Sequence, residues 1–447
     1  MATSLFDAGP FARLLGDAPL QRLLSDSAEI RAMMLVEAAL ATAQADQGVI
    51  PQEAADAINR AAREAEIDPA SLAEATGRDG VSVPGFVAAF RGQIGDPALA
   101  AHLHHGATSQ DILDTALSLR LRQILGLLDL RIEALLATAR NQARSHKTTL
   151  MAARTRGQVA MPTTLGAKIA QWAAPFLDHR GALTHMRPQI EVAHLHGAAG
   201  TSAALGPVGP VRARFASELG LHARDIAGHS DRAPIVALGH WLARVTSSCA
   251  KMGRDILLMS QSELQEVTAG PGGASSTMPH KSNPVLAEVL VALGHYARGQ
   301  AACLAAAQDH AHERDGAAWM LEWMVLPGLL RASGAALLLS ETALGSLRAC
   351  PDAMAATLDA LKGLTQAECA TFALSAHMPR PEAQDLVKTA CQDAVAAGTS
   401  LQEALSRLSP LPLDWAAILD PNAATGDASD QVEAFVARTA GMSGQPN

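Results

Sequence analysis

Hydrophobic residues recur every three or four positions along most of this chain, which is the spacing of one face of an α-helix. Between Ser25 and Asp46 the apolar positions step in this way, and they stop before Gly48 and Pro51, two residues that commonly end helices. The same spacing continues from residue 112 to about residue 146, through Leu117, Leu121, Ile124, Leu128, Ile132 and Leu135. We therefore predict an amphipathic helix in each segment.

Four further segments have the length and pattern of long helices, and they cover residues 162–188, 234–262, 284–310 and 319–350. Together with residues 112–146 they predict five long helices in succession, which is typical of an elongated bundle. Shorter helices are expected before and after them. We therefore predict an all-α fold with three helical domains, and these cover residues 1–111, 112–350 (the long-helix bundle) and 351–447.

Composition supports the all-α fold and excludes some classes of binding partner. Only 3% of the residues are aromatic, whereas alanine and leucine, two strong helix formers, dominate. A net charge of −9 does not resemble a nucleic-acid-binding surface, so no nucleic acid partner is expected. Charged residues interrupt the apolar runs before they reach membrane-spanning length, and residues 1–13 lack the pattern of a secretory signal. We expect a soluble, cytoplasmic protein that does not contact a membrane.

The cysteines are odd in number and widely scattered, and they form no CxxC pair. They are Cys249, Cys303, Cys350, Cys369 and Cys391. This distribution is typical of buried apolar cysteines in a reducing compartment, and not of disulfides or metal ligands. Neither a metal nor a cofactor is expected.

The stretch from Gly270 to Pro284 reads Gly-Pro-Gly-Gly-Ala-Ser-Ser-Thr-Met-Pro-His-Lys-Ser-Asn-Pro. Its glycines permit backbone angles that other residues avoid, and its small residues leave amides free to face an anion. Lys281 adds a positive charge, and Asn283 adds amide donors. We interpret the stretch as an anion-binding loop before a helix, and the alternative is an ordinary polar connection.

This loop closely resembles the signature Gly-Ser-Ser-x-Met-Pro-x-Lys-x-Asn-Pro of the fumarase/aspartase superfamily, with Ala274 in place of the first glycine. The resemblance implies reversible β-elimination from a carboxylated substrate, through a carbanion delocalised into a carboxylate. It implies that Ser275 transfers the proton, while Lys281 and Asn283 stabilise the carbanion. It also implies a homotetramer whose active sites collect residues from three subunits. The loop residues expected to contact the substrate are Ser276 and Met278.

Residues 104–111 read His-His-Gly-Ala-Thr-Ser-Gln-Asp and resemble the superfamily's first signature, His-x-Gly-x-Thr-Ser-x-Asp. Thr108 and Ser109 lie close to the expected start of a helix, where free N–H groups favour an anion. The resemblance implies that both bind a substrate carboxylate, and that His104 donates to an anion or relays a proton. The alternative is plain N-capping by Ser109 or Asp111, with a structural role for His104.

Residues 154–166 resemble the second signature, Arg-Thr-His-x-Gln-x-Ala-x-Pro-x-Thr-x-Gly, except that Arg156 replaces the histidine. Gln158 matches the signature and is expected in the substrate site. Lyases that expel an amine or hydroxide must protonate that group, and arginine cannot do so because it stays charged. A carboxylate leaving group needs no such proton, and lactonisation of 3-carboxy-cis,cis-muconate meets this condition. Arg156 could instead hold a third carboxylate of the substrate.

Arg314 lies in the run His-Glu-Arg-Asp and suits bidentate binding of a carboxylate. Its alternative role is an ion pair with Glu313 or Asp315. The run Gly-x-x-Trp-x-x-Glu-Trp-x-x-Leu-Pro that follows resembles the superfamily branch that forms lactones from 3-carboxy-cis,cis-muconate. Its tryptophans, Trp319 and Trp323, could also be core residues. A glycine-rich turn at residues 197–201 resembles a turn found near such sites, or is an ordinary turn.

These features predict a cycloisomerase, an intramolecular lyase that converts 3-carboxy-cis,cis-muconate, a small tricarboxylate, to a carboxymuconolactone in protocatechuate catabolism. One alternative is adenylosuccinate lyase or a related β-eliminating lyase, which the His-Glu-Arg run favours and Arg156 opposes. A non-enzymatic alternative is an inactive helical oligomer. The retention of Ser275, Lys281 and Asn283 opposes it.

Overall fold

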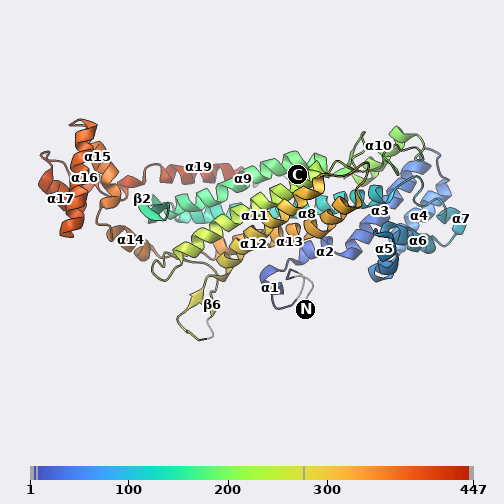
Figure 1. The fold of residues 1–447 in the computed structure, drawn as a ribbon, viewed down its shortest axis with the longest axis horizontal. Helices are drawn as coiled ribbons and strands as arrows, with labels where there is room; N and C mark the ends of the chain where they lie inside the picture. Colours follow the sequence, from blue (N-terminus) through green and yellow to red (C-terminus); the bar gives the residue numbers. More distant parts are fainter. Residues whose placement is uncertain (1–4, 7–8, 275–276, 442–447) are drawn as a thin grey trace. The chain divides into compact units, whose positions relative to one another are not determined.

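The computed structural model describes residues 5–6, 9–274 and 277–441 (Figure 1). Its contacts group into two compact units. Unit 1 combines Met1–Arg131, His179–Ser247 and Leu293–Ala336, and unit 2 combines Ile132–Asp178, Ser248–Ala292 and Leu337–Asn447. Each unit is built from segments that are far apart in the sequence. The division into three consecutive domains remains a prediction.

Long helices dominate the fold, as the periodicity predicted. Five described helices exceed 20 residues, and they are α8 (Ser109–Ser145), α9 (Leu165–Ile190), α11 (Ala233–Met259), α12 (Val285–Ala305) and α13 (Gly316–Gly345). The predicted helices begin and end within about five residues of these bounds. The all-α fold class is therefore confirmed.

Small residues allow the long helices to pack closely within unit 1. Gly239 of α11 faces α12 and α13, since a Cβ atom there would lie 2.5 Å from a methyl group of Leu304 and 3.5 Å from one of Leu329. The hydroxyls of Thr246 and Ser333 lie 3.0 Å apart and join α11 to α13. A chain rich in alanine and glycine can form these contacts because its backbones approach without large side chains between them.

Shorter helices complete unit 1. They are α1 (Ala12–Leu15), α2 (Ala18–Leu23), α3 (Asp26–Ala45), α4 (Gln52–Glu64), α5 (Ala73–Asp79), α6 (Val83–Ile94), α7 (Pro97–Ala100) and α10 (Val208–Leu219). The Ser25 side chain accepts a hydrogen bond from the Ala28 N–H and so caps α3. These helices enclose a hydrophobic core that includes Phe86, Phe90 and Phe215.

Six C-terminal helices belong to unit 2, and the middle four of them form their own hydrophobic cluster. They are α14 (Pro351–Asp359), α15 (Ala367–Ser375), α16 (Arg380–Ala397), α17 (Leu401–Leu408), α18 (Trp415–Ile418) and α19 (Ala428–Ala440). Leu374, Leu405 and Trp415 are among the buried residues of this cluster. The region after residue 351 is therefore helical, as the all-α fold class predicted.

A β-hairpin stands where the sequence predicted only a connector. Strands β1 (Leu150–Thr155) and β2 (Gln158–Thr164) pair antiparallel around a two-residue turn formed by Arg156 and Gly157. The φ angles of these two residues are 51° and 82°, which is the sign pattern of a type I′ turn. Asn-Gly or Asp-Gly usually marks such a turn, so Arg-Gly gave no signal.

The remaining described strands are two residues long and pair two by two. The pairs are β3 (Val192–Ala193) with β4 (His222–Ala223), β5 (Val267–Thr268) with β8 (Arg348–Ala349), and β6 (Gly273–Ala274) with β7 (Ser282–Asn283). The pair β3–β4 is parallel and the other two are antiparallel. These short pairs fasten loops and do not form a layer of the fold.

Helix α13 and the cysteines bear on two expectations from composition, and the expectation of buried cysteines is wrong. Helix α13 is long and apolar enough to cross a membrane by length and composition alone, but Glu322, Arg331 and Glu341 interrupt its apolar sequence, as expected. Its most apolar window is 67% buried, which is typical of a core helix. Of the five cysteines only Cys249 is buried, whereas Cys303 and Cys350 are exposed. They lie on a solvent-facing position of α12 and just before α14, where a small thiol is tolerated.

Candidate active site

The start of α8 carries Thr108 and Ser109, the predicted carboxylate-binding residues. The backbone N–H of Thr108 donates to Asp111 Oδ2 at 3.1 Å. Asp111 therefore caps the helix start, as the capping interpretation predicted. Thr108 and Ser109 are only half-buried. Capping by Asp111 is thus compatible with carboxylate binding by the two hydroxyl residues.

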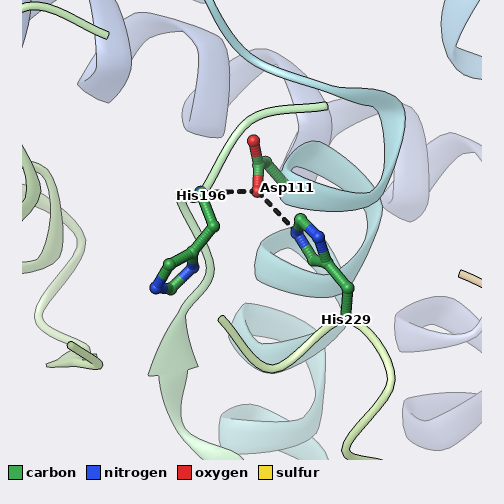
Figure 2. A group of neighbouring side chains, drawn as sticks. All are labelled: Asp111, His196 and His229. Atoms are coloured by element: carbon green, nitrogen blue, oxygen red, sulfur yellow. Dashed lines mark hydrogen bonds and ion pairs between the residues drawn. The ribbon is translucent and has the colours of Figure 1, made fainter. Parts of the chain in front are cut away.

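Asp111 also fastens a distant loop to α8. The backbone N–H groups of His196 and Gly197 donate to its two carboxylate oxygens at 2.9 Å each. The Nε2 atom of His229 lies 2.9 Å from Asp111 Oδ1 (Figure 2). The glycine-rich turn at residues 197–201 is thereby held against the helix start.

Asp111, His196 and His229 are residue types that bind metals, and their donor atoms all lie within 4.8 Å of one another. Four hydrogen bonds already occupy the two oxygens of Asp111. Burial, with a smaller contribution from the charge of Arg212, lowers the pKa of His196 to about 4, so its ring is neutral at physiological pH. These contacts explain the cluster as an attachment between the turn and α8.

Arg314 lies beside this helix start. Its Nε donates to Gln110 Oε1 at 2.8 Å, and its Nη2 donates to the Ala198 carbonyl at 3.1 Å. The alternative of an ion pair with Asp315 is wrong, because Asp315 accepts hydrogen bonds from the backbone N–H groups of Ala311, Ala317 and Ala318. Those bonds lower the pKa of Asp315. Arg314 is therefore grouped with the start of α8 and the glycine-rich turn.

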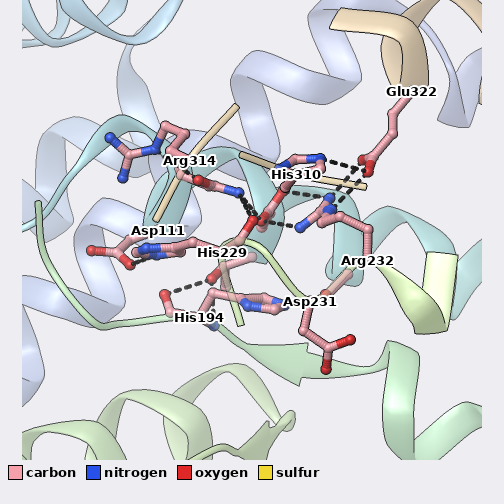
Figure 3. A network of polar contacts seen from close by, with 12 residues as sticks. Asp111, His194, His229, Asp231, Arg232, His310, Arg314 and Glu322 are labelled. Carbon is pink, nitrogen blue, oxygen red and sulfur yellow. Dashed lines mark hydrogen bonds and ion pairs between the residues drawn. The ribbon is translucent and has the colours of Figure 1, made fainter. Parts of the chain in front are cut away.

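A buried ionic network extends from Gln110 into unit 1 (Figure 3). Gln110 Nε2 donates to Asp114 Oδ2 at 3.1 Å. Arg232 donates to both oxygens of Asp114 at 2.7 and 3.2 Å and to both oxygens of Glu322 at 2.7 and 2.6 Å. No role was predicted for Asp114, Arg232 or Glu322, although Glu322 is the glutamate of the run that resembles the lactone-forming branch.

The two carboxylates of this network titrate differently. Burial opposes ionisation of Asp114, but the charge of Arg232, the charge of His194 and the hydrogen bonds from Arg232 and Gln110 together outweigh burial and lower the pKa of Asp114. For Glu322 burial outweighs the hydrogen bonds from Arg232 and raises the pKa. Asp114 is thus the firmly ionised partner of Arg232, and it offers Gln110 a charged acceptor.

His104 is held by a buried carboxylate of α3. Its Nδ1 lies 2.6 Å from Glu37 Oε1, and the Glu37 side chain is completely buried. Burial opposes protonation of His104, but the hydrogen bond and charge of Glu37 outweigh it and raise the pKa. His104 has a positive φ of 64°, which non-glycine residues rarely adopt. The imidazole is therefore fixed in place and biased towards the cationic form.

The tryptophans of the lactone-forming pattern have different positions. Trp319 is buried in the core of unit 1, so its interpretation as a core residue is correct. Its ring centroid lies 4.6 Å from that of Trp323. Trp323 is half-buried and lines a cavity of about 560 Å³ in unit 1.

The second signature forms the β1–β2 hairpin. Arg156 lies at its turn and Gln158 begins β2, and both residues are exposed. Arg154 instead donates to both oxygens of the buried Glu266 at 2.9 and 2.7 Å. Arg154, the first residue of the signature, therefore anchors the hairpin. Arg156, which replaces the histidine of the signature, lies exposed at the turn.

The Ser-Ser loop is closed at its base by the pairing of β6 with β7, in which Gly273 faces Asn283. Gly272 has a φ of 73°, and a Cβ atom there would lie 1.9 Å from Ser282 Oγ, so only glycine fits. The Lys281 N–H donates to the Met278 carbonyl at 3.0 Å, and both side chains are exposed. The predicted residues Ser275 and Ser276 lie outside the described residues.

The described site residues divide between the two units. The members in unit 1 are His104, Thr108, Ser109 and Arg314. The members in unit 2 are Arg156, Gln158, Met278, Lys281 and Asn283. The unit 1 members include cation-bearing and hydroxyl side chains around one helix start, and the unit 2 members lie on two hairpins.

The sequence matches a known protein family over more than half of its length. A family model described as lyase matches residues 17–299. The chain belongs to this lyase family. It is 37% identical to the 3-carboxy-cis,cis-muconate cycloisomerase of Pseudomonas aeruginosa, across 100% of this chain and 98% of the relative. It is also 34% identical to a nitrosuccinate lyase of Streptomyces davaonensis, across 97% of this chain and 95% of that protein.

A solved structure shows the same fold in this lyase family. The 3-carboxy-cis,cis-muconate lactonizing enzyme from Pseudomonas putida superimposes with a TM-score of 0.92 and is 33% identical, covering 97% of this chain and 100% of that chain. The resemblance to the fumarase/aspartase superfamily is therefore confirmed over the full length and not only in the signature motifs.

Proposed function

We propose that this protein is a 3-carboxy-cis,cis-muconate cycloisomerase of protocatechuate catabolism. The observation that carries the proposal is full-length similarity to proteins of that name, at 37% identity in sequence and a TM-score of 0.92 in structure. The run from Trp319 to Trp323, which resembles the lactone-forming branch, supports the same choice.

The reaction joins one carboxylate of the substrate to its conjugated diene. The carboxylate oxygen adds to a double-bond carbon, and the electron pair of that bond moves onto the carbon beside another carboxylate. Lys281 and Asn283 stabilise the resulting dianionic aci-carboxylate. Ser275 then delivers a proton to the carbanion and regains one from solvent. One C–O bond and one C–H bond form, one C=C π bond is lost, and the trianionic substrate becomes a dianionic lactone by taking up one proton.

The remaining predicted residues hold the carboxylates of a trianionic substrate. Arg314 and the cationic form of His104 provide positive charge, and Thr108 and Ser109 provide hydroxyl donors beside a helix start. Arg156 provides a further guanidinium at an exposed turn. The other proposed substrate contacts are Gln158, Ser276 and Met278.

Arg156 excludes some related reactions but not all. Adenylosuccinate lyase must protonate an amine leaving group, which arginine cannot do. A nitrosuccinate lyase would release nitrite, which is stable as an anion and needs no acid. The 34% identity to such an enzyme therefore makes nitrosuccinate the substrate to test as the second candidate.

We further propose a cytoplasmic homotetramer whose active sites are shared between subunits. The resemblance to the fumarase/aspartase superfamily, whose active sites collect residues from three subunits, supports this arrangement. Large apolar side chains on three of the long helices are exposed in the single chain, and they are Leu130, Leu258 and Met324, with exposures of 64%, 52% and 71%. Such exposed residues are expected where helices of neighbouring subunits pack.

The test is the ultraviolet absorbance of the conjugated diene. Purified protein should remove this absorbance from 3-carboxy-cis,cis-muconate, and the Ser275→Ala variant should lose most of the rate while remaining folded by circular dichroism. Parallel assays with nitrosuccinate and adenylosuccinate should show little turnover. Fast turnover of nitrosuccinate with no loss of muconate absorbance would replace the proposal with the second candidate.

A further inference from the structure

Two arginines of unit 1, Arg232 and Arg314, belong to the same polar cluster. The hydrogen-bond acceptors of Arg232 are charged, whereas those of Arg314 are neutral. Arg232 is 3% exposed and donates to the carboxylates of Asp114 and Glu322. The two hydrogen bonds of Arg314 described above go to neutral oxygens, those of Gln110 and Ala198. Carboxylates offset the charge of Arg232, whereas neutral acceptors hold Arg314 and leave its charge available to an anion.

The amide of Gln110 has a fixed orientation. Gln110 is completely buried, and its Nε2 donates to Asp114 Oδ2 at 3.1 Å and to the His229 carbonyl at 2.8 Å. Both acceptors lie on the NH₂ side, so the carbonyl oxygen must face the other way, towards Arg314. A flipped amide would place its oxygen against the Asp114 carboxylate and its NH₂ group against the guanidinium.

The groups behind Gln110 are themselves fixed. Two hydrogen bonds from Arg232 hold Asp114, and Arg232 is held in turn by Glu322 of α13. The terminal nitrogens of Arg314 point away from this network in Figure 3. Gln110 thus binds the Nε atom on the buried side and the Ala198 carbonyl binds one N–H of Nη2, so that Nη1 and the second N–H of Nη2 remain for a ligand.

We infer that Gln110 is a positioning residue for Arg314. Its neutral amide, oriented by Asp114 and the His229 carbonyl, holds the Arg314 guanidinium so that its end meets a substrate carboxylate. A glutamate at this position would also accept the hydrogen bond, but it would neutralise the charge that the substrate needs. The inference rests on the proposed function, because it assigns Arg314 to carboxylate binding.

The test is steady-state kinetics on 3-carboxy-cis,cis-muconate with the full-length protein. Gln110→Met keeps the side-chain volume and removes the amide. We expect KM to rise about tenfold or more, with kcat changed much less, since a hydrogen bond to a charged group has been lost. In an Arg314→Ala background the same change should have no further effect on KM, because the group that Gln110 positions is gone.

The matched control is Ser118→Ala, which removes another buried side-chain hydrogen bond of α8, that from Ser118 Oγ to the Ile190 carbonyl at 2.9 Å. KM should be unchanged in this variant. If Gln110→Met does not fold, Gln110→Glu replaces it, and the same rise in KM is expected. A KM within about twofold of the wild type, or an equal loss with and without Arg314, would overturn the inference.

Failure of the proposed function is seen separately, as no turnover by the wild-type protein. In that case a crystal structure of Gln110→Met decides the inference. A displaced Arg314 guanidinium would support it, and a guanidinium in the same place would overturn it.

Discussion

The pair formed by Glu37 and His104 links the folded state to pH. The folded-state pKa of His104 is raised above the ordinary value of 6.5, so the folded chain binds this proton more tightly than the unfolded chain. The stabilisation is complete below the unfolded-state pKa, and it is lost as the pH rises through the raised folded-state pKa. The pair therefore stabilises the protein in mildly acidic solution and less in alkaline solution.

Glu37→Gln should remove this pH dependence. We expect the free energy of unfolding to fall by about 1.5–3 kcal/mol below about pH 6, where the charged hydrogen bond is complete, and by less above about pH 9. Urea unfolding at both pH values measures the difference. Glu29→Gln in the same helix is the control, because Glu29 pairs with Arg120, which does not titrate in this range. An equal loss for Glu37→Gln at both pH values would contradict the prediction.

Arg156 occupies a backbone conformation that does not suit its residue type. Its φ of 51° places it in the left-handed region, which costs a residue with a Cβ atom about 1–2 kcal/mol. Such an outlier at an exposed turn is consistent with a residue kept for its side chain.

Arg156→Gly should therefore separate stability from activity. We expect the variant to be as stable as the wild type or up to about 1 kcal/mol more stable, because strain is relieved while chain flexibility increases. The proposed loss of a carboxylate contact should lower kcat/KM about tenfold or more. Thermal unfolding and the absorbance assay measure the two effects. A stable variant with unchanged kcat/KM would remove Arg156 from the proposed site.

At the scale of elements, the contact between the end of α8 and the start of α9 explains the last glycine of the second signature. The Gly166 N–H donates to the His146 carbonyl at 2.8 Å. A Cβ atom on Gly166 would lie 2.5 Å from the Ala143 carbonyl oxygen. The hairpin and its turn are positioned through this close approach of two backbones.

Gly166→Ala should destabilise the protein by about 1–3 kcal/mol, since the backbones must move apart. Gly181→Ala is the matched control in the same helix, because a Cβ atom there meets nothing within 4 Å. That control should stabilise the protein by about 0.5–1 kcal/mol through higher helix propensity. Chemical unfolding of both variants measures the contrast, and similar changes in the two would refute the explanation.

Local patterns predicted the long helices, because each helix hides one face and so repeats its apolar residues. They did not predict the β1–β2 hairpin, since Pro162 argues against a strand and Arg-Gly is an unusual turn. Motifs located Thr108, Ser109 and Arg314. Their supports could not be found, because Arg314 meets Gln110 204 positions away in the sequence and Arg232 meets Asp114 118 positions away. Contacts between residues so far apart produce no periodic pattern and no local motif in the sequence.

At the scale of the whole molecule, the proposed shared sites predict complementation between inactive variants. Ser275→Ala and Arg314→Ala each remove one proposed function. In a mixed tetramer some sites would combine an intact Ser275 with an intact Arg314 from different subunits. Activity should therefore reappear after the two variants are mixed, unfolded and refolded together.

Each variant refolded alone is the control and should remain inactive. Continued inactivity of a mixture that size-exclusion chromatography shows to be tetrameric would place both residues in a site formed by one subunit. A monomeric wild-type protein would contradict the proposed assembly itself.

The family and the fold class could be predicted from the sequence, because signature motifs and helix periodicity are both local. The boundaries of the two compact units could not. Unit 1 uses three separated segments, and its core includes residues as far apart as Ile30 and Trp319. Domain boundaries predicted from a sequence cut the chain into consecutive segments. A unit built from three separated segments cannot be described by such cuts.

The discontinuity of unit 1 has a consequence for protein synthesis. Its first segment ends at Arg131, but its last segment ends at Ala336, roughly 200 residues later. At about 5–20 residues per second, a ribosome needs about 10–40 seconds to make the intervening chain. During that interval the nascent N-terminal helices lack Trp319 and the other late partners of their core. The part of their apolar surface that Trp319 and Trp323 cover must stay exposed or be covered by a chaperone until the ribosome has made α13.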